Sequence, residues 1–272
     1  MIGKPWLVAA AFACVLPLPA QPLKPETNSA FECYVRSAEE RAAARTTFLI
    51  ADADSAMLQS LARDRGARTV PGNGPNPHKI TGAMVYDWIG TIFIPGATVE
   101  RTVRMLQDYD HRPQYFPEII AASKLMCRGG EERFGFSMRL KEPAVIDTEN
   151  DVVWERVDAR RWRCRSYSTK VTEIGKQHGY LYRLNSYWRF SETGQGVFVE
   201  GQTLTLSGEF SSLMRSLGSL AGINPEKSLR KSLASMRETL TKSREDFPAP
   251  PAGLPACGET VRMAACAAQA SQ

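Results

Sequence analysis

The chain has 272 residues, of which 43% are hydrophobic and 23% are charged, and its formal net charge is +5 at pH 7. These values are those of an ordinary globular protein and exclude a disordered chain. The small positive charge is compatible with transient contact with an anionic membrane surface, but it excludes the concentrated basic patch of a nucleic-acid-binding protein. No stretch after residue 20 is apolar for long enough to span a bilayer.

Residues 1–20 match the pattern of a signal peptide. Lys4 supplies a basic start, Trp6–Leu16 an apolar core and Leu18–Ala20 a candidate cleavage site. Leu18 is larger than the residue preferred at such a site, so the point of cleavage stays open. Two alternatives are a lipid attachment at Cys14 and a membrane-anchoring helix, which the short length of the segment disfavours. We therefore expect an exported protein, periplasmic or secreted.

Export would place the cysteines where disulfides form. Cys257 and Cys266 lie close together in a Pro/Ala-rich tail, residues 248–272, which we expect to be either disordered or stapled by a disulfide between them. Cys127 and Cys164 fall on separate predicted strands, and their pairing depends on an adjacency that the sequence does not show. The cysteines lack the Cys-x-x-Cys spacing of a zinc or redox site, so we interpret them as buried apolar residues unless paired.

Residues 21–80 form a mainly helical N-terminal extension by pattern. Ser29–Thr47 and Asp54–Arg65 each carry an apolar stripe at helical spacing. Phe48–Ile50 between them is a short strand candidate. Gly66–Lys79 is rich in Gly, Pro and Asn and is typical of a loop.

Residues 81–247 are predicted as the main domain. A strand over Ala83–Ile94 is followed by a helix over Thr98–Tyr109 and a short helical turn held between Pro113 and Pro117. Segments of period two then predict a meander of long antiparallel strands. These segments are Ile119–Cys127, Glu131–Leu140, Ala144–Val157, Arg161–Ile174, Tyr180–Ser191 and Val197–Ser207.

Two helices are predicted after the strands, over Gly208–Gly222 and Asn224–Asp246. The second begins with Asn224 as a natural N-cap. Its apolar residues recur at steps of four and three on one narrow face: Leu229, Leu233, Met236 and Leu240. A long helix with a single apolar stripe needs a surface to cover, and the preceding strands supply one.

Several segments resemble the START/Bet v 1 superfamily, also called helix-grip, polyketide-cyclase-like or SRPBCC. They are Asp108–Tyr109, Tyr115–Ile119 and Ser123–Leu125, while Arg183–Phe190 is similar to a penultimate strand of exported bacterial members. The resemblance covers roughly residues 82–247. It implies an α+β helix-grip fold, a curved seven-stranded antiparallel sheet wrapped over a long C-terminal helix. It implies a cavity between sheet and helix but no particular reaction.

Alternation along the strands predicts which side chains line this cavity. The expected aromatic and apolar walls are Tyr86, Trp88, Phe134, Phe136, Met138, Tyr182, Leu184 and Trp188. Polar residues on apolar strands are sharper markers, so Arg183, Asn185 and Glu200 are added as candidate ligand-binding residues, and an arginine among them would hold an anionic head group. Two alternatives stay open: the apolar residues fill a packed core, and Arg183 or Arg189 forms a cross-strand ion pair with Glu200 on a solvated face.

The function predicted from this pattern is an exported binding protein that holds a lipid or other hydrophobic ligand, with no cofactor and no metal. The alternative is a cyclase- or aromatase-type enzyme, which would need an acid–base pair in the cavity. His78, His111 and His178 all fall in predicted loops, and Asp87 and Glu200 are the interior carboxylates worth testing. A third hypothesis is an interaction module with a filled interior.

Overall fold

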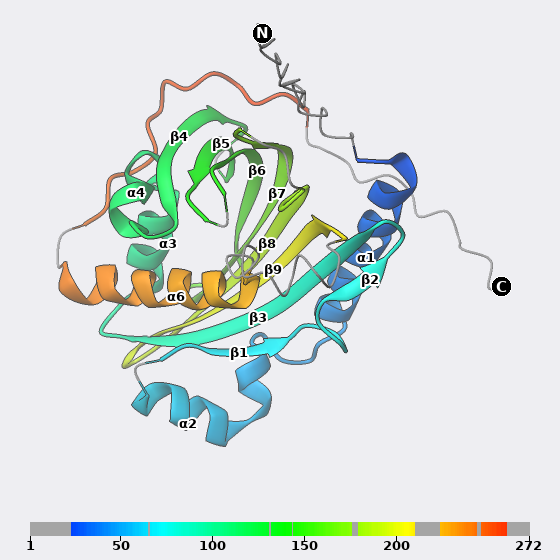
Figure 1. Cartoon of the computed structure of the whole chain (residues 1–272). Helices are drawn as coiled ribbons and strands as arrows, with labels where there is room; N and C mark the ends of the chain where they lie inside the picture. Colours follow the sequence, from blue (N-terminus) through cyan, green and yellow to red (C-terminus); the bar gives the residue numbers. More distant parts are fainter. Residues whose placement is uncertain are drawn as a thin grey trace, which may run out of the picture.

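The computed structural model describes residues 23–64, 66–130, 132–142, 144–175, 179–209, 224–243 and 246–259. The predicted signal peptide lies outside these residues, as does nearly all of the helix predicted over 208–222. The described chain is a curved antiparallel sheet with one long helix across its concave face and N-terminal helices on the opposite side (Figure 1).

The sheet has nine strands in the order β1-β3-β9-β8-β7-β6-β5-β4, with β2 paired to β3 off this path. The strands are β1 (Arg68–Pro71), β2 (His78–Ile80), β3 (Ala83–Pro95), β4 (Ile120–Arg128), β5 (Arg133–Leu140), β6 (Ile146–Arg156), β7 (Arg161–Glu173), β8 (Arg183–Thr193) and β9 (Gly196–Gly208). Strands β3 to β9 are the seven that the sequence predicts, so the helix-grip fold class is confirmed with two additional strands.

The two additional strands correct the prediction of a loop over Gly66–Lys79. Strand β1 pairs with β3 in the register Arg68 to Thr91, and β2 pairs with β3 in the register His78 to Val85. Both are too short to show an alternating pattern of their own. They form because their backbones hydrogen-bond to the edge of β3, and the periodicity of the residues does not reveal such pairing.

The helices are α1 (Pro25–Ala43), η1 (Ile50–Ala53), α2 (Ser55–Arg63), α3 (Val99–Gln107), η2 (Tyr109–His111), α4 (Arg112–Tyr115) and α6 (Pro225–Lys242). The strand predicted over Phe48–Ile50 is wrong, because the chain turns into η1 at Ile50. The Leu49 backbone N–H donates to the Asp52 carboxylate over 2.8 Å, which favours a tight turn over an extended strand.

Helix α6 is the element around which the concave face is built. Asn224 caps it by accepting a hydrogen bond from the Lys227 backbone N–H over 2.9 Å, as predicted. Its predicted stripe is buried against the sheet: Leu229, Leu233, Met236 and Leu240. A Cβ at Gly90 of β3 would lie 2.7 Å from Leu233 Cδ1 and 3.0 Å from Leu229 Cδ2, so the close approach of helix and strand depends on this glycine.

The convex face of β3 and β9 is covered by the N-terminal segment. Apolar side chains of α1, among them Phe31 and Val35, pack against Val85, Leu204 and Leu206 of the sheet. Both faces of β3 and β9 are therefore covered, and most residues of these strands are buried, including the polar Asp87 and Glu200.

The C-terminal segment crosses the edge strand β4. The Arg128 backbone N–H donates to the Pro255 carbonyl over 3.0 Å, and a disulfide joins Cys127 to Cys257. The predicted partner of Cys257 was Cys266, which lies outside the described residues. The observed pairing corrects that prediction, because the extended tail runs alongside β4 and brings residues 130 positions apart into contact.

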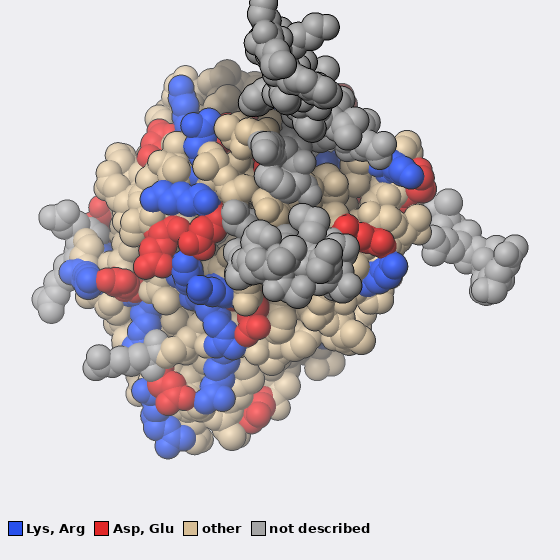
Figure 2. All heavy atoms as spheres, viewed as in Figure 1, with Lys and Arg blue, Asp and Glu red and all other residues tan. Residues whose placement is uncertain are grey.

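The outer face of α6 carries charges of both signs, and Figure 2 shows basic and acidic side chains interspersed on this side of the molecule. Lys231 lies 3.4 Å from Glu118 and 3.2 Å from Glu142, and Arg230 lies 2.8 Å from Glu226. The positive charge of the helix is therefore largely neutralised where it arises. In the described part of the chain, no helix has the length and hydrophobicity needed to cross a membrane.

Candidate functional site

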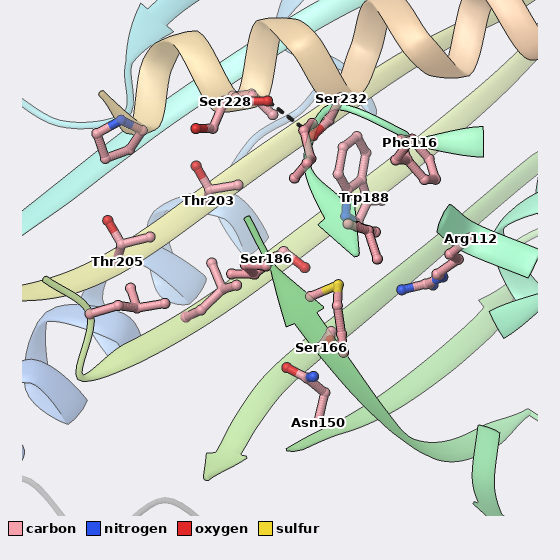
Figure 3. Close-up of a pocket in the computed structure, with 18 of the residues that line it drawn as sticks. Arg112, Phe116, Asn150, Ser166, Ser186, Trp188, Thr203, Thr205, Ser228 and Ser232 are labelled. Atoms are coloured by element: carbon pink, nitrogen blue, oxygen red, sulfur yellow. Dashed lines mark hydrogen bonds between the residues drawn. The ribbon is translucent and has the colours of Figure 1, made fainter. Parts of the chain in front are cut away.

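A cavity of about 220 Å³ lies between the concave face of the sheet and α6 (Figure 3). Side chains from α3, α4, α6 and strands β4 to β9 line it. Its apolar wall consists mainly of Phe136, Met138, Leu140, Val152, Trp154, Leu184, Trp188, Leu229 and Met236.

The cavity exists because small polar residues occupy inward positions on three neighbouring strands. Ser166 of β7 is paired with Ser186 of β8, which is paired in turn with Thr203 of β9; Thr205 and Ser207 continue the row. A protein core is close-packed only when large side chains fill its inward positions. Short hydroxyl side chains side by side leave a space that the surrounding aromatic residues do not fill.

Arg112 is the charged residue that faces the cavity from α4 (Figure 3). Its guanidinium carbon lies 4.4 Å from the centre of the Tyr109 ring and 4.5 Å from the centre of the Phe136 ring. Tyr109 is itself fixed, since its hydroxyl accepts a hydrogen bond from Trp154 Nε1 over 2.9 Å. The two aromatic rings, one of them fixed by Trp154, therefore hold the guanidinium in one place.

One nitrogen of the Arg112 guanidinium donates a hydrogen bond to the protein and another has no partner. Nη2 donates to the Leu106 carbonyl over 2.7 Å, whereas Nε is buried and has no hydrogen-bond partner among the described residues. No carboxylate in the described part of the chain lies within ion-pair distance of Arg112. Burial lowers the pKa of its guanidinium, and the distant charge of Asp108 opposes that effect. An arginine side chain nevertheless stays protonated in proteins, so the cavity contains a positive charge.

Cys164 is the other reactive group in the cavity wall. It is a free, buried cysteine, and burial raises the pKa of its thiol to about 12. At neutral pH it is therefore a protonated thiol with little nucleophilic character. Among the described residues, no cluster of His, Cys, Asp and Glu is placed to hold a metal ion.

Four of the predicted site residues line the cavity: Phe136, Met138, Leu184 and Trp188. Three more belong to the concave side but lie outside the cavity. Phe134 packs into the core with its ring centre 5.7 Å from that of Tyr109. Tyr86 and Trp88 share the face of β3 that carries Gly90, and Trp88 packs against the core around α6.

The other four predicted residues lie away from the cavity. Tyr182 packs with the cluster under α1. Arg183, on the convex side, donates to the Asn28 side chain over 2.8 Å. Asn185 shares the convex face with its cross-strand partner Leu204, which packs under α1, and Glu200 is enclosed by the N-terminal segment. Their burial comes from the N-terminal extension, which covers a face that the sequence suggested was solvated or part of the site.

The two carboxylates considered for acid–base chemistry are also on the convex side. Asp87 accepts hydrogen bonds from Tyr34 and Gln202, and Glu200 pairs with Arg45 and Arg189. The pair of Arg189 with Glu200 is one of the alternatives that the sequence left open.

None of the histidines that the structure describes lines the cavity. His78 lies in β2 rather than in a loop, and His111 lies in η2 beside Asp108. His178 is outside the described residues.

Arg112 and the hydroxyl row are absent from the residues predicted for the site. The signal for Arg112 was an arginine set among the aromatic residues Tyr109, Tyr115 and Phe116 in a turn bounded by prolines. The signal for the cavity was the repeat Thr203, Thr205 and Ser207 at alternate positions of β9, with Ser166 and Ser186 on the two strands beside it. Both signals are weak in the sequence, because exposed strands and turns carry the same residue types.

The strand order, the long helix on the concave side and the cavity between helix and sheet together define the architecture. This is the helix-grip fold. No protein-family model matches the sequence, and no curated protein does.

Solved structures similar to this helix-grip chain include START-type lipid transfer proteins and a polyketide aromatase/cyclase. A STAR-related lipid transfer protein from Xanthomonas axonopodis has a TM-score of 0.45 and 17% identity, and the match covers 65% of this chain and 99% of that one. Human STARD10 has a TM-score of 0.41 and 13% identity, with coverages of 74% and 86%.

The third structure is the di-domain ARO/CYC StfQ from the steffimycin biosynthetic pathway. Its TM-score is 0.41 at 15% identity, covering 58% of this chain and 52% of that one. At these values the likenesses do not identify a ligand or a reaction.

Proposed function

We propose that this protein is exported and binds one compact hydrophobic molecule, a short lipid chain or a ring compound, in the cavity between the sheet and α6. The observation that carries the proposal is the cavity itself, whose exposed surface is mainly aromatic and aliphatic. Ligand sites of small molecules have this composition, in which apolar contacts supply affinity and a few polar groups fix orientation.

The size of the cavity limits the ligand. Its volume of about 220 Å³ is below the range of roughly 300–1,000 Å³ that is typical of small-molecule sites. An apolar cavity of about 150 Å³ accommodates benzene. The cavity therefore suits a molecule somewhat larger than one aromatic ring, and it is too small to enclose a whole two-chain phospholipid.

Two measurements test this function. Native mass spectrometry of gently purified protein is expected to show a bound molecule, or uptake of one equivalent of a short-chain or aromatic compound. Because Cys164 lines the cavity, its modification by methyl methanethiosulfonate should slow when a ligand is bound. Cys164→Ser serves as the control for modification elsewhere. A purely apo mass with every compound tested, together with unchanged thiol modification, would contradict the proposal.

The cyclase or aromatase alternative has no acid–base pair assigned to it in the described cavity. Asp87 and Glu200 lie on the other face, and the titratable side chains in the wall are Arg112, Glu142, Cys164 and Tyr180. The alternative stays a prediction, and a pH-dependent turnover of a polyketide-like substrate would be its test.

A further inference from the structure

The cavity contains a positive charge that the protein does not neutralise. Arg112 lines the cavity wall, and the carboxylate that acts on it from a distance, Asp108, is already engaged. Asp108 accepts hydrogen bonds from the Tyr115 hydroxyl and from the His111 ring, the latter over 2.8 Å. Removing a charged side chain from water is costly unless a partner of opposite charge compensates.

The unpartnered Nε–H of Arg112 is suited to an anionic oxygen. Nη2 donates to the Leu106 carbonyl, while the buried Nε has no partner in the described part of the chain. Nε–H points along the side edge that it shares with Nη2, and a carboxylate oxygen placed at that edge accepts a charge-assisted hydrogen bond from Nε. The Tyr109 and Phe136 rings lie against the guanidinium and keep this edge from rotating away.

Thr203 and Thr205 line the cavity away from Arg112 (Figure 3), and the hydroxyls of both residues lack hydrogen-bond partners among the described residues. Glu142, another charged residue of the wall, is already paired with Lys231 over 3.2 Å. Between Arg112 and the two threonines lie Trp188 and the rest of the apolar wall. This distribution of charge suits a ligand that carries its own charge at one end only.

We propose that the ligand of this cavity is a compact hydrophobic monocarboxylate whose carboxylate accepts a hydrogen bond from Nε of Arg112. This inference rests on the proposed function, because it specifies the molecule that the same cavity holds. A carboxylate on Arg112 compensates its burial, and the alkyl or aromatic body of the acid fills the apolar hollow. Hydrogen bonds to a charged group are worth about 1.5–3 kcal/mol, which corresponds to roughly a tenfold to hundredfold preference for the acid over a neutral analogue of the same shape.

The test compares decanoate with decanamide, which has the same shape without the charge, by titration calorimetry at neutral pH. The unmodified protein is expected to bind decanoate at least tenfold more tightly. 2-Naphthoate and 2-naphthamide form a second pair, which distinguishes a ring from an acyl chain as the body of the ligand. This comparison needs no variant, so it stands even if changes at Arg112 impair folding.

Two variants then assign the preference to Arg112. Arg112→Gln is expected to bring the acid and the amide within about threefold of each other by weakening only the acid. Arg163→Gln makes the same substitution on β7 at an exposed arginine paired with Glu155, and it is expected to keep the preference. It controls for loss of one positive charge from the chain.

The outcomes separate this inference from the proposed function. Equal binding of acid and amide overturns the inference and leaves the hydrophobic cavity in place. A preference for acid that persists in Arg112→Gln also overturns it, since another group would then hold the carboxylate. If neither acid–amide pair binds and no neutral hydrophobic compound binds, the proposed function is overturned as well.

Discussion

Arginine side chains are buried on both faces of the sheet, but among the described residues only those on the convex face have a carboxylate partner. On the convex face, Arg45 and Arg189 lie 2.8 Å and 3.1 Å from the same carboxylate oxygen of Glu200. The Glu200 carboxylate also accepts the Ile50 backbone N–H over 2.6 Å. On the concave face, Arg112 has no carboxylate at such a distance among the described residues. The arginines of the convex face are therefore neutralised by a carboxylate, whereas the charge of Arg112 faces the cavity without one.

Two further carboxylates on the convex face, those of Glu39 and Asp87, also have hydrogen-bond partners. Glu39 of α1 accepts hydrogen bonds from the hydroxyls of Tyr167 and Tyr187 on the sheet, the latter over 2.9 Å. Asp87 accepts from Tyr34 of α1 over 3.0 Å and from Gln202 over 2.7 Å. Each of these carboxylates joins the N-terminal segment to the strands, so polar contacts fix its position over the sheet.

An unbonded nitrogen alone does not mark a binding site. Arg45 also has nitrogens without hydrogen-bond partners in the described chain, yet Glu200 neutralises its charge and it faces no cavity. Arg112 differs because the countercharge is missing and a hollow lies beside it. The comparison teaches that buried polar groups with partners position the chain, whereas a buried charge beside an empty cavity points to a ligand.

The largest effect is expected from breaking the convex network. Glu200→Ala leaves Arg45 and Arg189 without their common partner, and loss of one member of a buried ion pair costs about 3–5 kcal/mol of unfolding free energy. Denaturant unfolding measures it. Glu155→Ala removes an exposed partner of Arg163 and should cost less than about 1 kcal/mol. Similar losses from both variants would show that Glu200 does not hold the N-terminal segment in place.

A somewhat smaller loss of stability is expected on the concave face. Met236 is fully buried and lines the cavity, so Met236→Ala should cost about 2–4 kcal/mol and enlarge the hollow. The preferred ligand should therefore become larger, which a series of carboxylates of increasing length tests. Leu240→Ala truncates a buried residue of the same helix outside the cavity wall. It should lower stability to a similar degree without changing the preferred length, and a shift in both variants would contradict this picture.

Filling the cavity should change stability little and binding strongly. Ser186→Leu introduces an apolar side chain between Ser166 and Thr203, where space exists already. We expect a change in unfolding free energy of about 1 kcal/mol or less. Ligand uptake in native mass spectrometry should fall at least tenfold. Ser123→Leu makes the same change on the edge strand β4, outside the cavity, and ligand uptake by this variant should equal that of the unmodified protein. Normal uptake by Ser186→Leu would place the ligand elsewhere.

Much of the fold could be predicted because it follows from local patterns. The stripe from Leu229 to Leu240 specifies one buried helix face, and seven alternating segments of similar length specify a meander. The cavity positions Phe136, Met138, Leu184 and Trp188 follow from the same alternation. These features depend on spacing within a single element, which the sequence displays directly.

The rest of the site depends on contacts between distant segments. Arg183 and Leu184 are adjacent on β8, so only one of them can face the cavity, and alternation does not say which face is concave. The covering of the convex face by α1 decides it. Arg112 becomes a cavity residue only because Phe136 and Tyr109, from a strand and a turn, meet beneath it. Periodicity within one strand contains no information on either contact.

The smallest expected effect concerns pH and the convex carboxylate Asp87. Burial raises the pKa of Asp87 above its ordinary value of 3.8, although hydrogen bonds from Gln202 and Tyr34 oppose the rise. The folded state therefore holds this proton more tightly than the unfolded state, and the contribution of Asp87 to stability decreases as pH rises through the interval between the two pKa values. Asp87→Asn lacks this titration, so its stability relative to the unmodified protein should improve between pH 3.5 and pH 7.

Asp147 provides a control of opposite sign. Its hydrogen bond with Arg139 lowers the pKa of this exposed carboxyl, so its contribution to stability is present above the unfolded-state pKa and is lost as pH falls. Asp147→Asn should therefore lose stability relative to the unmodified protein over the same rise in pH. Denaturant midpoints of the three proteins at several pH values measure both trends. Parallel trends in the two variants would mean that burial of Asp87 under α1 does not control its protonation, and the closed character of the convex face would have to rest on its apolar contacts alone.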